Sequence, residues 1–163
     1  MENKRILILV TGGSIDDIDL TKRPKKPMTH IPEMLKRARI TLDVRVETLM
    51  MKDSREITDL DRRYILERIL EAKEDRIIIT HGTFTMPMTA KYLGVRVKNK
   101  AIVLTGSAIP FSEKDSDALF NLGAAITRVQ TLPKGIFITM NGEIFRWNEV
   151  HKNLEKDIFE RTK

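Results

Sequence analysis

The sequence predicts an α/β fold in which helices cover both faces of an open parallel sheet. Two observations indicate this class: short apolar segments alternate with segments of helical periodicity, and the connections between them are short. Strand–helix–strand units of this kind place consecutive strands parallel to one another. The 163 residues suffice for one three-layer domain of this type, and we expect residues 1–163 to form a single domain.

Five apolar segments are expected to form the sheet. RILILV at residues 5–10 is a continuous apolar run, which is typical of a strand buried on both faces. LDVRVETLM at 42–50 instead contains alternating apolar residues, which is also typical of a strand. The predicted strands are residues 5–10, 42–50, 75–80, 100–106 and 135–142.

Helical periodicity fills the segments between the strands. The helices are predicted at residues 31–38, 58–74, 86–94 and 116–130. In the second of these, Thr58 is a plausible N-cap, and Asp61 stands where a capping box carries its acidic residue. Its expected apolar stripe consists of Leu60, Tyr64, Ile65, Ile69 and Leu70. The polar tail, residues 146–163, fits either a docked arm or a short helix.

The composition, 41% hydrophobic and 32% charged, is typical of a soluble globular protein. No apolar run approaches the roughly 18 residues that a membrane-spanning helix needs, and the apolar run near the N-terminus is too short for a signal peptide. We therefore expect a cytoplasmic protein without a membrane partner. The absence of Cys fits that compartment and rules out disulfides and thiolate chemistry.

The net charge of +6 permits an anionic partner. The densest basic cluster is Lys22, Arg23, Lys25 and Lys26. This cluster fits a solvated loop or a nucleic-acid-binding surface, but it lacks the aromatic residues that usually stack on bases. We expect the solvated loop and no nucleic-acid partner.

Ligands of open parallel sheets bind at the carboxyl ends of the strands, so the segments that follow the strands are the places to search. These segments are TGGSIDD (11–17), MKDSRE (51–56), THGTFT (80–85) and TGSAIP (105–110). Every one of them carries a hydroxyl, and three carry Gly. Since the carboxyl ends of parallel strands meet at one edge, we expect these segments to converge on one site.

Taken singly, each candidate residue has two interpretations. Ser14 follows two glycines and fits an exposed nucleophile or a simple cap of the next segment. Ser54 fits a ligand for a substrate carboxylate or part of a turn. Thr83 fits a second nucleophile or a group that orients water, and His81 fits a base or, more commonly, a structural hydrogen-bonding residue. The three His lack metal-ligand spacing and no nucleotide fingerprint is present, so we expect neither a metal nor a cofactor.

Together these segments resemble the asparaginase family, specifically its N-terminal domain. The residues that carry the resemblance are TGGSI (11–15), THGTFTM (80–86), IVLTGSAIP (102–110), SDALFNLGAAI (116–126) and MNGEIFRWNEVHKN (140–153). They occur in the family's order along nearly the whole chain. The resemblance implies a Rossmann- or flavodoxin-like domain, similar to compact members of the family that consist of this domain alone.

The resemblance also implies an amidohydrolase that converts L-asparagine, or a related amide, to the acid and ammonia. Ser14 takes the position of the nucleophilic Thr, Thr83 that of a second catalytic Thr, and Ser54 that of a residue that binds the substrate's α-carboxylate. The other expected substrate-binding residues are Gly13, Asp53, Gly82, Phe84 and Ser107. The implied partners are a small amide or amino acid and further copies of the chain, in a homodimer or larger assembly.

The chain departs from the family pattern at three places. Phe84 replaces an Asp that pairs with the substrate ammonium and belongs to a Thr-Lys-Asp group. The catalytic Lys is expected near the end of the helix at 116–130, where Leu132 stands and Lys134 is displaced by two residues. The loop after Ser14 lacks the family's Tyr. These departures leave an alternative function open, a non-catalytic module that binds a small carboxylate or amide.

Overall fold

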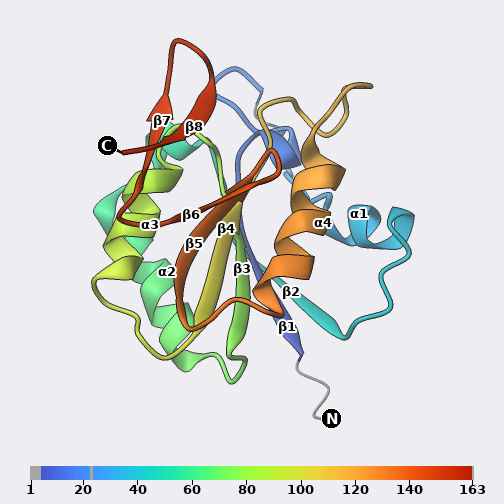
Figure 1. The fold of residues 1–163 in the computed structure, drawn as a ribbon. Coiled ribbons are helices and arrows are strands. Elements are labelled where there is room, and N and C mark those ends of the chain that lie inside the picture. Colours follow the sequence, from blue (N-terminus) through green and yellow to red (C-terminus); the bar gives the residue numbers. More distant parts are fainter. Residues whose placement is uncertain (1–4, 23, 163) are drawn as a thin grey trace.

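The computed structural model, which describes residues 5–22 and 24–162, has the predicted α/β architecture (Figure 1). A six-stranded sheet runs through the centre in the order β2-β1-β3-β4-β5-β6. Its strands are β1 (Ile6–Gly12), β2 (Val44–Lys52), β3 (Arg76–Thr80), β4 (Ala101–Thr105), β5 (Gly135–Met140) and β6 (Glu143–Arg146). All five predicted strands are confirmed.

Strands β1 to β5 are parallel, and β1 lies between β2 and β3. This order is the flavodoxin-like variant of the doubly wound sheet. The carboxyl ends of the five strands therefore meet at one edge, which lies at the top of Figure 1. We refer to it below as the carboxyl edge.

The sheet is not purely parallel, because β6 runs antiparallel to β5. The reversal occurs at Asn141 and Gly142, whose φ angles are 49° and 90°. Two consecutive residues with positive φ form the tight hairpin turn that favours the sequence Asn-Gly. The predicted strand at 135–142 was therefore two residues too long, because the Asn-Gly pair belongs to the turn.

The tail forms a second, two-stranded sheet of β7 (Val150–Asn153) and β8 (Ile158–Arg161). Of the two alternatives for the tail, the short helix was therefore wrong. Val150 and Phe159 are only 8% and 6% exposed, because both pack into the apolar core on one side of the main sheet. Figure 1 shows that this hairpin stands beside α3, at the end of the molecule that carries the carboxyl edge.

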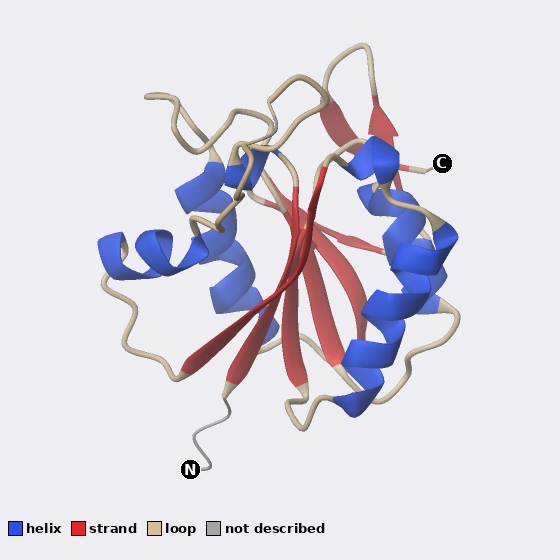
Figure 2. Cartoon of the chain, turned by 180° about the vertical axis from the view of Figure 1, so that it is seen from behind, coloured by secondary structure: helices blue, strands red, loops and turns tan. Residues whose placement is uncertain are grey.

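The four predicted helices are present as α1 (Ile31–Arg37), α2 (Asp59–Glu71), α3 (Met86–Gly94) and α4 (Ala118–Val129). Helices α2 and α3 cover one face of the sheet, and α1 and α4 cover the other (Figure 2). Two short 3₁₀ helices, η1 (Ser14–Asp16) and η2 (Ser54–Glu56), follow β1 and β2 directly. No helix among residues 5–22 and 24–162 is both long and apolar enough to cross a membrane.

Helix α2 begins as predicted, since Thr58 and Asp61 form a complete capping box. The expected apolar stripe was wrong at three of its five positions: Leu60, Tyr64 and Leu70 are exposed, and only Ile65 and Ile69 lie in the core. Ile65 and Ile69 are four residues apart, so they lie on the same face of the helix, and this face packs on the sheet. The other three apolar side chains lie on the face that points to solvent.

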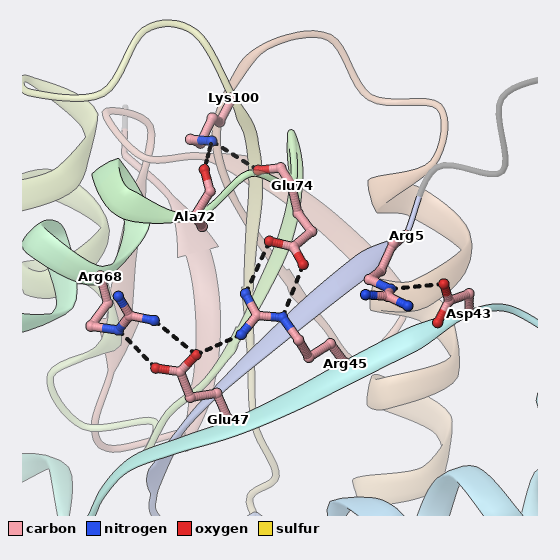
Figure 3. Close-up of polar contacts among 8 residues, drawn as sticks. All are labelled: Arg5, Asp43, Arg45, Glu47, Arg68, Ala72, Glu74 and Lys100. Atoms are coloured by element: carbon pink, nitrogen blue, oxygen red, sulfur yellow. Dashed lines mark hydrogen bonds and ion pairs between the residues drawn. The ribbon is translucent and has the colours of Figure 1, made fainter.

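An ion-pair network joins α2 to the edge strand β2 (Figure 3). Glu47 accepts hydrogen bonds from Arg68 at 2.7 Å and from Arg45 at 2.9 Å, and Arg45 also donates to Glu74. The hydrogen bond from Arg68 is the largest cause that lowers the pKa of Glu47. Charged side chains along an edge strand also discourage further strands from pairing with it.

Candidate active site

Hydrogen bonds of the backbone and of one side chain join the four strand-end segments at the carboxyl edge. The Gly13 N–H donates to the Lys52 carbonyl at 3.0 Å, and the His81 N–H donates to the Thr105 carbonyl at 2.9 Å. The buried Thr11 hydroxyl donates to the Thr80 carbonyl at 2.7 Å. The predicted meeting of these segments at one edge of the sheet is therefore present in the structure.

Two glycines of this cluster lie in close contact with each other. Gly13 has a φ of +81°, and a Cβ atom on it would lie 2.5 Å from Cα of Gly82. A Cβ atom on Gly82 would lie 2.8 Å from Cβ of Ser54. Only glycine fits both positions without displacing its neighbours. As a result, the loops that carry Ser14, Ser54 and Thr83 are in direct contact.

The predicted hydroxyl residues differ in their surroundings. Ser14 is half-buried at the start of η1, and Thr83 is 7% exposed. The Ser54 hydroxyl accepts a hydrogen bond from the Thr85 N–H at 3.3 Å, and the Thr85 hydroxyl donates to the Ser54 carbonyl at 2.6 Å. Ser107 is 1% exposed, and within the described part of the chain its hydroxyl has no hydrogen-bond partner.

Asp53 and Phe84, both expected to bind substrate, are connected through Arg55. The Asp53 carboxylate accepts hydrogen bonds from Nε and a terminal nitrogen of Arg55, at 2.8 and 2.7 Å. This pairing lowers the pKa of Asp53, so its carboxylate stays ionised. The same guanidinium stacks on Phe84, with its central carbon 4.2 Å from the ring centre. Asp53 thus holds Arg55 in place.

His81 is a structural residue, as its commoner interpretation predicted. Its Nδ1 lies 2.7 Å from the Gly82 carbonyl, which can only accept, so Nδ1 carries the proton. Nε2 then accepts from the Thr89 hydroxyl at 2.8 Å, and Thr89 in turn accepts from Nε of Arg62 at 3.1 Å. Complete burial lowers the pKa of His81 to about 4. A neutral imidazole committed at both nitrogens does not act as a base.

This burial predicts a loss of stability in mild acid. The folded pKa of about 4 lies below the unfolded value of about 6.5, so the unfolded chain binds the extra proton between them. The contribution of neutral His81 to the free energy of unfolding is fully present above about pH 6.5. This contribution should fall by about 2 to 3 kcal/mol between pH 7 and 4.5. Urea unfolding at both pH values measures this loss.

Two variants isolate the contribution of His81 from that of the carboxylates. His81→Asn should be less stable at pH 7 but should lose less stability on acidification than the wild type. His151→Gln, at a more exposed histidine, should keep the wild-type dependence. An identical pH dependence in the wild type and in His81→Asn would contradict the assignment.

Two aspartates that follow Ser14 join the beginning of the next loop to its end at Thr29 and His30. Oδ1 of the buried Asp16 accepts from the His30 N–H at 2.6 Å and from the Thr29 hydroxyl at 2.9 Å, while Asp17 pairs with the His30 ring at 3.0 Å. Burial raises the pKa of Asp16. The loop between these anchors borders a pocket of about 310 Å³ next to Lys52.

In the predicted basic cluster, Lys22, Lys25 and Lys26 are exposed, and Arg23 lies outside the described residues.

A family model described as the N-terminal part of asparaginase matches residues 5–159. The chain belongs to the asparaginase family. An L-asparaginase of Thermococcus kodakarensis is 33% identical over 91% of this chain and 47% of its own length. A glutaminase-asparaginase of Pseudomonas fluorescens biotype A is 28% identical over 94% of this chain and 47% of its own. The crystal structure of a probable cytoplasmic L-asparaginase from Campylobacter jejuni has a TM-score of 0.79 at 30% identity, covering 97% of this chain and 53% of that one. The chain therefore spans about half the length of these relatives.

The position near Leu132, where the family's catalytic lysine was expected, does not lie at the carboxyl edge. Helix α4 runs away from the carboxyl edge, and the carbonyls of Val129 and Leu132 accept hydrogen bonds from Arg76 at the beginning of β3. Lys134 follows at this same end, next to Gly135, whose N–H donates to the Lys100 carbonyl. The expected position near Leu132 was wrong, because it lies at the opposite edge of the sheet from Ser14.

A lysine that the sequence analysis missed lies near the carboxyl edge. The side chain of Lys152, on β7, is only 4% exposed, with Nζ 2.6 Å from Asp157 and 4.9 Å from the centre of the Phe159 ring. Strand β7 packs against α3, the helix that begins directly after Thr85. Lysines are rarely buried without a specific partner or function. The available signal was the position of Lys152 inside the family-like segment 140–153.

Proposed function

We propose that the protein is an asparaginase-like amidohydrolase that converts a carboxamide to the acid and ammonia. The observation that carries this proposal is the contact between Gly13 and Gly82, which brings the loops of Ser14 and Thr83 together. Two hydroxyls on adjoining loops at the carboxyl edge of a parallel sheet suit a two-step hydrolysis with a covalent intermediate.

In the proposed reaction, the Ser14 hydroxyl attacks the amide carbon and loses its proton as the C–O bond forms. The proton passes to the amide nitrogen, and ammonia leaves when the C–N bond breaks. A water molecule oriented by Thr83 then attacks the resulting ester, which releases the acid and restores the Ser14 hydroxyl. Gly13, Gly82 and Ser107 form the walls of this site, and Ser54 faces the substrate carboxylate.

The experiment that tests this function is an ammonia-release assay on L-asparagine, L-glutamine and simple primary amides. We expect turnover of at least one amide by the wild type, and none above background by a chain that carries both Ser14→Ala and Thr83→Ala. Absence of ammonia from every amide would overturn the proposal, and so would equal activity in the doubly substituted chain.

Lys152 is the candidate for the lysine of the Thr-Lys-Asp group. If it serves proton transfer, Lys152→Met should lower kcat by roughly 10²-fold, within the range typical of general acid–base catalysis. Lys156→Met, at an exposed position of the same hairpin, is the matched control and should keep full activity. Thermal unfolding of both variants separates a lost proton transfer from a damaged hairpin. Equal activity in Lys152→Met and the wild type would rule out this role.

Phe84 favours one second candidate, a non-catalytic module that binds a small carboxylate or amide. Its ring offers neither a charge nor a hydrogen-bond acceptor where the family pattern has Asp. Calorimetry with small acids and amides distinguishes the two functions. Binding without ammonia release supports the module, whereas release that depends on Ser14 excludes it.

The assembly and location of the protein are also proposals. We propose a homodimer or larger assembly in the cytoplasm, with a small molecule as substrate. The name of the Campylobacter jejuni relative, a probable cytoplasmic L-asparaginase, supports the location. Sedimentation equilibrium measures the assembly, and a monomer at micromolar concentration would contradict it.

A further inference from the structure

One wall of the candidate site is an aromatic ring covered by a cation. Phe84 directly follows Thr83 and is 44% exposed, and Arg55 directly follows Ser54. The Arg55 guanidinium lies 4.2 Å from the ring centre and is 39% exposed. Because Thr85 and Ser54 are joined by two hydrogen bonds, this wall is built into the site.

The wall offers no place for a substrate ammonium group. An aromatic ring can attract a cation through its face, but Arg55 already occupies a face of Phe84. Arg55 itself repels a second cation at this short range. The Asp53 carboxylate, whose side chain is 7% exposed, is engaged through both oxygens by Arg55.

The two aspartates that follow Ser14 most closely in the sequence, Asp16 and Asp17, are also engaged by other groups. Asp16 is 2% exposed, and its Oδ1 already accepts hydrogen bonds from the His30 N–H and the Thr29 hydroxyl. Asp17 pairs with the His30 ring and accepts from the Ser112 N–H. Lys52, at the end of β2, is a further cation, although it pairs with Asp61.

We propose that the site selects amides whose acid portion carries a carboxylate but no α-ammonium, that is, monoamides of simple dicarboxylic acids. This inference rests on the amidohydrolase function proposed above. The carboxylate lies toward Ser54 and the positive Arg55, and the unsubstituted α-carbon lies against the Phe84 ring. The chemistry at Ser14 stays the same, since the amide and water give the acid and ammonia.

The test compares two amides that differ only in the ammonium group. For the wild type, kcat/KM for succinamic acid should exceed that for L-asparagine by at least about tenfold, the ratio that corresponds to 1.4 kcal/mol. Phe84→Asp should reverse the preference, because it supplies a carboxylate. Phe84→Leu is the matched control, since it keeps an apolar wall, and it should retain the preference for succinamic acid.

Binding of the corresponding acids keeps this inference separate from the activity itself. Calorimetry on the wild type should show succinate binding at least about tenfold more tightly than L-aspartate, whether or not either amide is hydrolysed. Succinate preference without any ammonia release would overturn the amidohydrolase function and leave the selectivity standing. Equal or tighter binding of L-aspartate, or no binding of either acid, would overturn the selectivity.

Discussion

Replacing Ser14 with Ala should lower the rate of ammonia release by roughly 10⁴-fold or more, a loss typical of removing a catalytic nucleophile. Ser14 starts η1 directly after Gly13, so its position is set by the contact of Gly13 with Gly82. Thr83→Ala should cause a loss of similar order. The two hydroxyls act on one reaction, so the doubly substituted chain should be hardly worse than Ser14→Ala alone.

Two control variants make this result specific. Ser14→Thr keeps the hydroxyl and should retain much of the activity, because the family pattern has Thr at this position. Thr127→Ala removes an exposed hydroxyl on α4 that donates to the Gly123 carbonyl, and it should leave the rate unchanged. Equal rates in Ser14→Ala and the wild type, measured by ammonia release at saturating substrate, would remove Ser14 from the mechanism.

The sequence predicts the fold well where the chain is buried or capped. Runs such as residues 5–10 are apolar because β1 is covered by helices on both faces, so their composition alone identifies them. The Thr58 cap can also be predicted from the sequence, because the capping box is a local interaction within four residues. The convergence of the strand-end segments follows from the parallel topology, so the sequence alone predicts that they meet at one edge.

Features that depend on contacts between distant segments could not be predicted in this way. Leu60 and Tyr64 look like core residues, but the exact rotation of α2 on the sheet leaves both exposed. The side chain of Lys152 is buried only because its hairpin packs on α3 and the core. Nothing in the sequence pairs Arg55 with Phe84, whose positions come together only when η2 and the loop after β3 adjoin.

Replacing Gly13 with Ala should damage both the site and the fold. The new Cβ atom would lie 2.5 Å from both N and Cα of Gly82, and the φ of +81° is strained for any residue with a side chain. Relief requires the loops of Ser14 and Thr83 to separate. A shift of about 1 Å can cost roughly 10²-fold in rate, and because both hydroxyls move, we expect a loss of at least about 10³-fold. The strain and clash should also lower the free energy of unfolding by about 2 to 4 kcal/mol.

Gly123→Ala is the matched control, because it is the same substitution at a place without the constraint. Gly123 lies within α4, where a Cβ atom would meet nothing within 4 Å, and its φ is not in the left-handed region. Alanine there should leave the activity unchanged and raise the free energy of unfolding by about 0.5 to 1 kcal/mol, since glycine is a poor helix former. Urea unfolding and ammonia release on both variants measure the contrast. If Gly13→Ala behaved like Gly123→Ala, the two loops would not need the close contact from which the function is inferred.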